Sequence, residues 1–311
     1  MAQGDLGTVK LLDQVVQARL PMEVEDPTGR YCLPGAGEHA ASLARCATRY
    51  VAEETVARYC ASLVQTDAGM LVGDNDFLRV PAPELWLEWQ ALPLQDEMSG
   101  ARTGLLIEAD ASGRRGAVTT FWEQREGEPV VAQMTVQFDL DDAALHETAP
   151  TGAFMVRADE HPLALHLMFF LRPEWCRYFD RQQSDAVLTA AAAIAANILP
   201  GLEMLFTFSA LLAERTCLTE RAIDLSRLNR QRARRGGPAL LDHVEVRLDL
   251  AMESSRAVAG KGIGREAARL HAVRGHLVHR GDRTFWRRSH LRGDATRTGF
   301  TRTVHVTRKA G

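Results

Sequence analysis

The chain has 311 residues, and its 46% hydrophobic content is enough to bury the core of one large domain or two modest ones. The formal net charge of −3 conceals a division, because residues 221–311 hold 21 of the 37 Lys and Arg but only 8 of the 40 Asp and Glu. This excludes a uniformly acidic protein. It predicts an acidic body, residues 1–220, and a basic C-terminal module, residues 221–311, that contacts a polyanion.

Cysteine usage and apolar runs bear on the compartment. The five Cys form no C-x-x-C pair, so neither a disulfide framework nor a Cys-based zinc site is indicated. The first residues lack the basic and apolar regions of an export signal. The apolar run 186–213 is interrupted by Pro200 and Glu203, which favours buried helices over a membrane span. We expect a cytoplasmic protein without membrane contact.

The N-terminal half reads as helices followed by strands. Apolar residues at helical spacing predict a helix over 6–20 and a second helix over 38–65, with a turn at 26–29 between them. Leu85, Leu87 and Trp89 alternate with polar or aromatic residues, which is typical of a strand. Three further strands are predicted to form an antiparallel meander, at 103–109, 117–124 and 130–139.

The second half begins with helices and ends with short strands. After the acidic turn 139–142 the chain is predicted to be helical, with Ser184 as an N-cap and Pro200-Gly201 dividing the apolar run into a pair of helices. Small and polar residues predict a flexible loop at 252–266. Strands are predicted at 244–250, 273–279, 284–288 and 301–307. The expected fold is α+β: a helical N-terminal part, an antiparallel sheet, an apolar helix pair and a small basic β module.

Arginine, histidine and tryptophan gather between residues 271 and 294. Hairpin turns there would bring Arg side chains for phosphate and a Trp for base stacking onto one surface. This predicts contact with RNA or the ribosome, and the alternative is an Arg-rich sheet whose charges are solvated or paired internally. The candidate RNA-binding residues are Arg274, Arg280, Arg283, Trp286, Arg287, Arg288 and Arg292.

A catalytic alternative uses the same segment. His271, His276 and His290 could act as general acid and base beside the arginines, as in a ribonuclease or an RNA-processing toxin. Spacing alone does not assign such roles, and the chain contains neither G-x-S-x-G nor H-E-x-x-H. An all-His zinc site that adds His279 is untypical of structural zinc. We therefore expect no metal and no cofactor.

Two other groups of residues allow two interpretations each. The run 227–235 could form an arginine-rich helix along a polyanion, or a solvated linker. Trp86, Trp89 and Trp122 lie on neighbouring predicted strands and could line a groove for a peptide, since aromatic side chains supply much of such binding energy. A plain core sheet would explain these tryptophans equally well.

Four blocks of sequence resemble a family of phage and mobile-element proteins. The blocks are LRVPAPELWLEWQAL (78–92), the Phe121-Trp122 strand with VQFDLDD (136–142), ILPGLEMLFTFSALL (198–212), and His-x-x-Arg-Gly-His at 271–276 with Trp286 ten residues later. Their order and spacing agree over roughly residues 40–306. Members often carry an aromatic residue after the second His, where this chain has Leu277, which removes a stacking role from that position.

The resemblance implies a regulatory function. The family includes a type V-A anti-CRISPR protein that lowers production of the effector nuclease rather than blocking the assembled enzyme. A protein of this kind would recognise a target polypeptide while it is nascent on the ribosome and cause loss of its mRNA. The implied role is evasion of host defence in the bacterial cytoplasm, with the basic module facing RNA or the ribosome and the acidic body holding the peptide.

Overall fold

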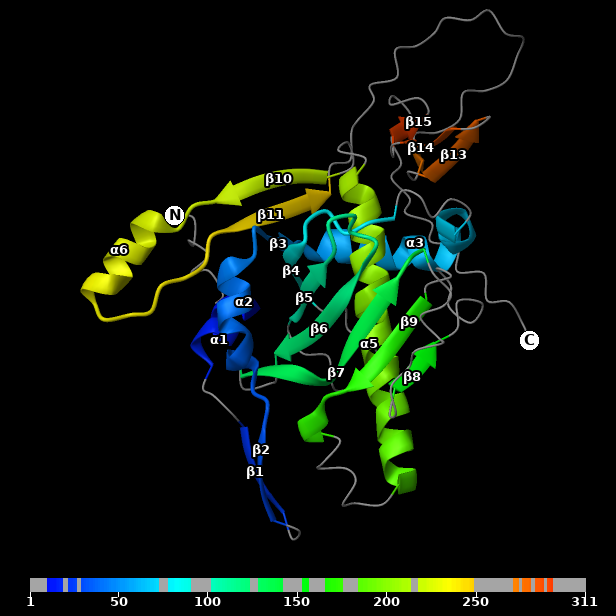
Figure 1. Cartoon of the computed structure of the whole chain (residues 1–311). Coiled ribbons are helices and arrows are strands. Elements are labelled where there is room, and N and C mark those ends of the chain that lie inside the picture. The colour runs from blue at the N-terminus through cyan, green and yellow to red at the C-terminus, as the bar shows by residue number, and fades with distance from the viewer. Residues whose placement is uncertain are drawn as a thin grey trace, which may run out of the picture. The chain divides into compact units, whose positions relative to one another are not determined.

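The chain divides into two compact units, residues 1–248 (unit 1) and 249–311 (unit 2), whose elements are shown in Figure 1. The computed structural model describes residues 10–18, 22–26, 29–72, 78–90, 102–123, 128–141, 153–156, 166–175, 184–213, 218–248, 271–273, 276–280, 283–287 and 290–292.

A mixed sheet organises unit 1. Among the described residues it has nine strands in the order β10-β11-β3-β4-β5-β6-β7-β9-β8 (Figure 1). β3 runs parallel to both of its neighbours, and all other neighbouring strands are antiparallel. The strands are β3 (Thr48–Ala52), β4 (Glu84–Trp89), β5 (Thr103–Ala109), β6 (Arg115–Glu123), β7 (Pro129–Asp139), β8 (Ala153–Val156), β9 (His166–Leu171), β10 (Leu218–Ile223) and β11 (His243–Leu248). Together with its helices, this sheet confirms the α+β class.

Helices cover both faces of the sheet. The long helices α3 (Glu54–Val72) and α5 (Ser184–Ala213) lie on one face, where Phe206 packs edge-on against Phe138 of β7 with ring centroids 5.3 Å apart. Short elements lie on the other face: α1 (Leu11–Gln17), the 3₁₀ helix η1 (Ala36–His39) and α2 (Ala40–Arg45). Because both faces are covered, central strands such as β4 are buried almost throughout instead of alternating between buried and exposed.

Two additional elements of unit 1 lie outside the layers. β1 (Met22–Asp26) and β2 (Gly29–Leu33) form an antiparallel hairpin around the turn predicted at 26–29. The helix α6 (Ser226–Arg234) joins β10 to β11 and corresponds to the basic run noted in the sequence. The run is therefore helical, and it connects two strands of unit 1 instead of linking an acidic body to a basic module.

The predicted meander is confirmed. β5 has the predicted bounds, and β6 and β7 begin within two residues of theirs. The N-terminal helix, predicted over 6–20, is observed as α1 and ends where Ala18 becomes extended. Residues 1–9 lie outside the described part.

The single helix predicted over 38–65 is wrong in its centre. The segment contains η1 and α2, then β3, and only then α3. In β3, Tyr50 lies opposite Leu87 of β4 and Val244 of β11, which are distant in sequence. Pairing with these strands overrides the local helical pattern.

The predicted pair of apolar helices is one continuous helix. α5 passes through Pro200, whose ring removes the hydrogen bond to the carbonyl of Ala196, four residues earlier. Both residues are exposed, so water can hydrogen-bond to that carbonyl and the helix need not break. Residues 191–213 of α5 are long and apolar enough to cross a membrane, yet a little over half of that stretch, 56%, is buried in the protein.

The predicted boundary at 220/221 falls inside β10. β11 pairs with both β10 and β3, so residues 221–248 belong to the sheet of unit 1 and the basic unit begins at 249. Unit 2 still has 14 Lys and Arg against 5 Asp and Glu, a net charge of +9, whereas unit 1 carries −12. The two units therefore carry opposite net charges, although the basic composition already begins within unit 1, at residue 221.

Several strands were not predicted. β8 and β9 occupy a segment expected to be helical, and β10 and β15 (His290–Arg292) follow no clear alternation. In unit 2 the predicted strands 273–279 and 284–288 are observed as β12 (His271–Val273), β13 (His276–Arg280) and β14 (Arg283–Arg287). The predicted loop 252–266 and strand 301–307 lie outside the described residues.

Candidate functional site

The basic segment of unit 2 follows one hairpin register. β13 pairs with β14 and β12 pairs with β15, both antiparallel. In every pair the two residues are the same number of positions away from Gly281-Asp282 along the sequence. The pairs begin with Arg280 opposite Arg283 and end with His271 opposite Arg292. A Gly-containing two-residue connection between such strands is a common hairpin signal.

This register places basic residues opposite one another. His276 lies opposite Arg287, Arg280 opposite Arg283, and His271 opposite Arg292. Like charges at directly opposite positions of an antiparallel pair destabilise it unless something neutralises them, and Arg280 opposite Arg283 is such a pair. Trp286 lies opposite Leu277, one position along the hairpin. Of the predicted RNA-binding residues, Arg274 and Arg288 lie outside the described part.

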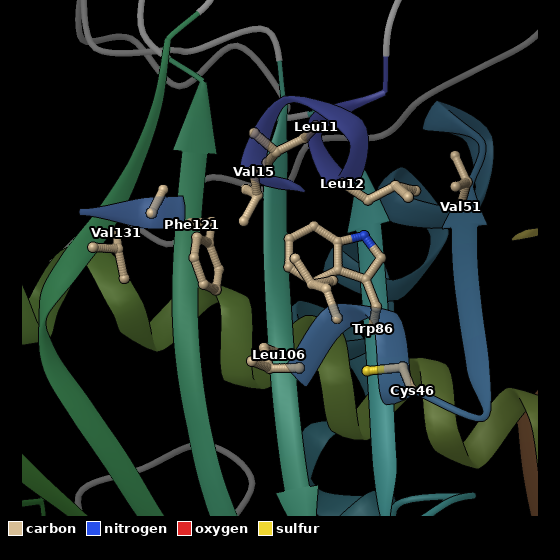
Figure 2. Close-up of a cluster of buried hydrophobic side chains, with 11 residues drawn as sticks. Leu11, Leu12, Val15, Cys46, Val51, Trp86, Leu106, Phe121 and Val131 are labelled. Atoms are coloured by element: carbon tan, nitrogen blue, oxygen red, sulfur yellow. The ribbon is translucent and has the colours of Figure 1, made fainter. Parts of the chain in front are cut away.

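The three tryptophans do not form a groove. Trp86 is fully buried between α1 and the sheet, with Leu11, Leu12, Val15 and Phe121 around it (Figure 2). Its indole leaves no room for a side chain at position 104, where a Cβ would lie 2.5 Å from the ring. The core interpretation is therefore correct for Trp86.

The other two tryptophans do not change that result. Trp89 is 7% exposed and lies on the α5 face, where its ring tip is 3.8 Å from a Cβ built on Gly201. Trp122 is only partly exposed, and it alternates with Phe121 along β6, so it belongs to the opposite face from Trp86. The peptide site predicted at these residues is thus corrected: Trp86 and Trp89 are core residues on opposite faces of the sheet, and Trp122 is partly buried on the same face as Trp89.

A buried carboxylate lies beside Trp86. Glu88 is fully buried, and its two oxygens accept hydrogen bonds from the backbone N–H groups of Leu11 and Leu12, at 2.9 and 3.0 Å. Trp86 Nε1 donates to it at 3.3 Å, and Arg102 forms an ion pair at 2.9 Å. This carboxylate therefore fastens the start of α1 to β4 and offers no free oxygen face to a ligand.

A second polar pair lies near η1. Arg172 Nη2 is 3.1 Å from His39 Nε2, and because a guanidinium only donates, that nitrogen accepts and the ring is neutral. Burial, together with the Arg172 charge, lowers the pKa of His39 from 6.5 to about 4. Since its accepting nitrogen is already occupied, His39 is not free to serve as a general base.

The described residues show neither a metal-binding cluster nor an activated buried thiol. Among them there is no cluster of three or more His, Cys, Asp or Glu that could hold a metal ion. Burial raises the pKa of the Cys46 thiol to about 11 and that of Cys60 to about 12, which disfavours the nucleophilic thiolate. The side chains of His271, His276 and His290, the catalytic alternative, lie outside the described part.

Comparisons of the chain with protein-family models, with curated proteins and with solved structures found no match. Sequence reasoning missed the Glu88 and His39 arrangements, and only one signal pointed to either. That signal is a lone Glu inside the apolar run LWLEW, because a charge in a buried strand needs partners.

Proposed function

We propose that this protein binds RNA through the hairpin of unit 2. The observation that carries the proposal is the register that sets Arg280 opposite Arg283 and His276 opposite Arg287. Arg280 and Arg283 carry like charges that repel one another, and phosphate groups would relieve that repulsion while Arg forks bind their oxygens. The net charge of +9 on unit 2 supplies the long-range attraction.

The biological role is proposed from the resemblance to the phage and mobile-element family. In that role the RNA is a message or a ribosome near a newly made polypeptide, and the outcome is reduced expression of the target. The tryptophans of unit 1 no longer supply the peptide site. The proposal therefore assigns residues to RNA contact only.

Salt dependence of binding tests the RNA contact. In the full chain, Arg280→Ala with Arg283→Ala should weaken binding of a labelled single-stranded RNA and flatten the slope of log affinity against log salt by about 1.4 units. The control is Arg45→Ala with Arg58→Ala, which removes two exposed arginines from unit 1. An unchanged slope in the unit 2 variant would contradict the proposal.

The same protein preparation tests the ribonuclease alternative. If purified protein cleaves the RNA and His276→Ala abolishes cleavage, the hairpin is an active site. Binding without cleavage supports the proposal. In that case the rate of RNA loss is the same with the His276→Ala variant as with the wild type.

A further inference from the structure

The helix α6 carries a dense set of arginines and buries none of its residues. It projects beyond the ends of β10 and β11 at the edge of the sheet (Figure 1). A nine-residue helix is marginal in water by itself, and apolar packing does not hold this one. Its stability must come from polar contacts.

The start of α6 is fixed by side-chain acceptors. Asp224 Oδ1 accepts the Ser226 N–H at 2.8 Å, and Asp242 Oδ1 accepts the Leu225 N–H at 2.7 Å. Asn229 then binds the returning chain twice, donating to the Leu240 carbonyl and accepting from the Leu240 N–H, both at 2.8 Å. The helix is thereby tied to the strand that follows it.

The end of α6 is closed by a glycine motif. Gly236 has φ +71, its N–H donates to the Ala233 carbonyl at 3.1 Å, and the Gly237 N–H donates to the Arg232 carbonyl at 2.9 Å. Arg232 Nε donates to the Pro238 carbonyl at 2.8 Å. Both ends are therefore defined, so the outward side chains start from a preorganised backbone.

Three arginines share the side of α6 that faces away from these contacts. Arg227, Arg230 and Arg234 follow the i, i+3, i+7 spacing of one helix face, opposite Asn229 and Arg232, and all three are exposed. No ion pair within 4 Å between described residues involves any of the three, and Arg230 interacts only at longer range with the exposed carboxylate of Asp224.

Interaction with the helix dipole does not explain why three arginines lie on this face of α6. Cations in the last turn, such as Arg234, interact favourably with the helix dipole, but Arg227 in the first turn is opposed by it. Arg230 and Arg234 are four residues apart, a spacing at which like charges repel. Residues 221–248 hold seven Arg against three Asp and Glu, inside a unit whose net charge is −12. Five of these seven arginines lie in residues 227–235, so the positive charge is concentrated in α6 and the residue that follows it.

We propose that α6 is a second nucleic-acid contact, in which Arg227, Arg230 and Arg234 bind consecutive phosphates along an RNA backbone. The face extends for about 10 Å along the helix axis. Guanidinium forks match phosphate oxygens in pairs, which suits a backbone rather than a base sequence. The choice of RNA as partner rests on the proposed function, whereas the surface itself belongs to unit 1 and does not depend on unit 2.

The test uses the full chain with Arg227→Ala, Arg230→Ala and Arg234→Ala combined. Probes are a labelled single-stranded RNA, a double-stranded RNA and a double-stranded DNA of equal length, titrated in about 0.05–0.2 M salt. We expect RNA affinity to fall by about tenfold or more and the salt slope for single strands to fall by about two units. The matched control is Arg45→Ala, Arg58→Ala and Arg79→Ala, which makes the same charge change at exposed positions of unit 1.

Each outcome separates this inference from the proposed function. An unchanged slope in the α6 variant, with a reduced slope in the Arg280 and Arg283 variant, overturns the inference and leaves unit 2 as the RNA site. Equal losses in the α6 and control variants also overturn it, because general charge would then suffice. A loss confined to the RNA probes supports it, and an equal loss on DNA assigns α6 to any phosphate backbone and overturns the choice of RNA. Poly-glutamate competing as well as RNA at equal charge also overturns it.

Discussion

Glu88 shows how one residue can serve two elements. A charged group buried in a strand is costly unless it is paired and hydrogen-bonded. Here the carboxylate receives two N–H groups from the first turn of α1 and the Arg102 guanidinium. The same group therefore satisfies two helix N–H groups that have no partner within the helix and holds α1 over Trp86.

His39 is the residue whose ionisation most clearly affects stability. Burial, followed by the charge of Arg172, lowers its pKa from 6.5 to about 4, so the folded protein resists protonation there. Between these pH values the unfolded chain binds more protons at this site than the folded chain. The stability that His39 contributes is thus present above pH 6.5 and is lost as the pH falls toward about 4.

His39→Gln should remove this part of the pH dependence. The Gln amide oxygen can still accept from Arg172 but does not titrate, so the variant should lose about 2–3 kcal/mol less stability than the wild type on going from pH 7 to pH 4. Urea titrations of both proteins at several pH values measure the difference. Parallel pH curves for the two proteins would show that His39 is not protected from protonation.

At the scale of elements, the β5–β6 turn depends on one glycine. Gly113 has φ +72, and a Cβ there would lie 2.2 Å from the carbonyl oxygen of Val80. The Val80 N–H also donates to the Gly113 carbonyl at 2.8 Å, which holds the chain before β4 against this turn. Gly236 has nearly the same φ, +71, but nothing within 4 Å of its Cβ position.

These two glycines form a matched pair for mutation. Gly236→Ala should cost only the left-handed backbone strain, about 1–2 kcal/mol. Gly113→Ala adds a clash with backbone that cannot move freely, so it should destabilise by about 3 kcal/mol or more. Chemical denaturation of both variants measures the gap. Equal losses would mean that the Val80 segment yields at no cost.

Sequence reasoning succeeded for elements defined by local pattern. β5 is a short apolar run that ends before the Ser112-Gly113 turn signal, and β13 and β14 flank a Gly-Asp step, so the strands carrying the candidate site were predictable. β3 was not, because Tyr50 owes its strand conformation to partners at Leu87 and Val244. The burial of Trp86 could not be predicted either. A tryptophan on a strand has the same sequence pattern in a core as in a binding groove, and only the position of the covering helix α1 distinguishes the two.

At the scale of the whole molecule, charge and compactness divide the chain at nearly the same place. Unit 1 carries −12 and unit 2 carries +9, and the boundary lies after β11 rather than before β10. β11 contributes the fully buried Val246 and pairs with both β10 and β3. Among the described residues, every strand of this sheet belongs to unit 1.

Truncation should reveal this boundary. A fragment of residues 1–248 retains every strand of the sheet and should unfold cooperatively with a melting temperature close to that of the full chain. A fragment of residues 1–222 loses β11, which leaves one edge of β3 unpaired and removes Val246 from the core. This truncation should lower the free energy of unfolding by about 3 kcal/mol or more. Near-UV circular dichroism and thermal melts compare the two.

The longer fragment should also bind single-stranded RNA at least tenfold more weakly than the full chain in about 0.1 M salt, because it lacks the unit 2 hairpin. If the shorter fragment melts like the longer one, β11 does not complete the core and the basic unit begins nearer residue 221.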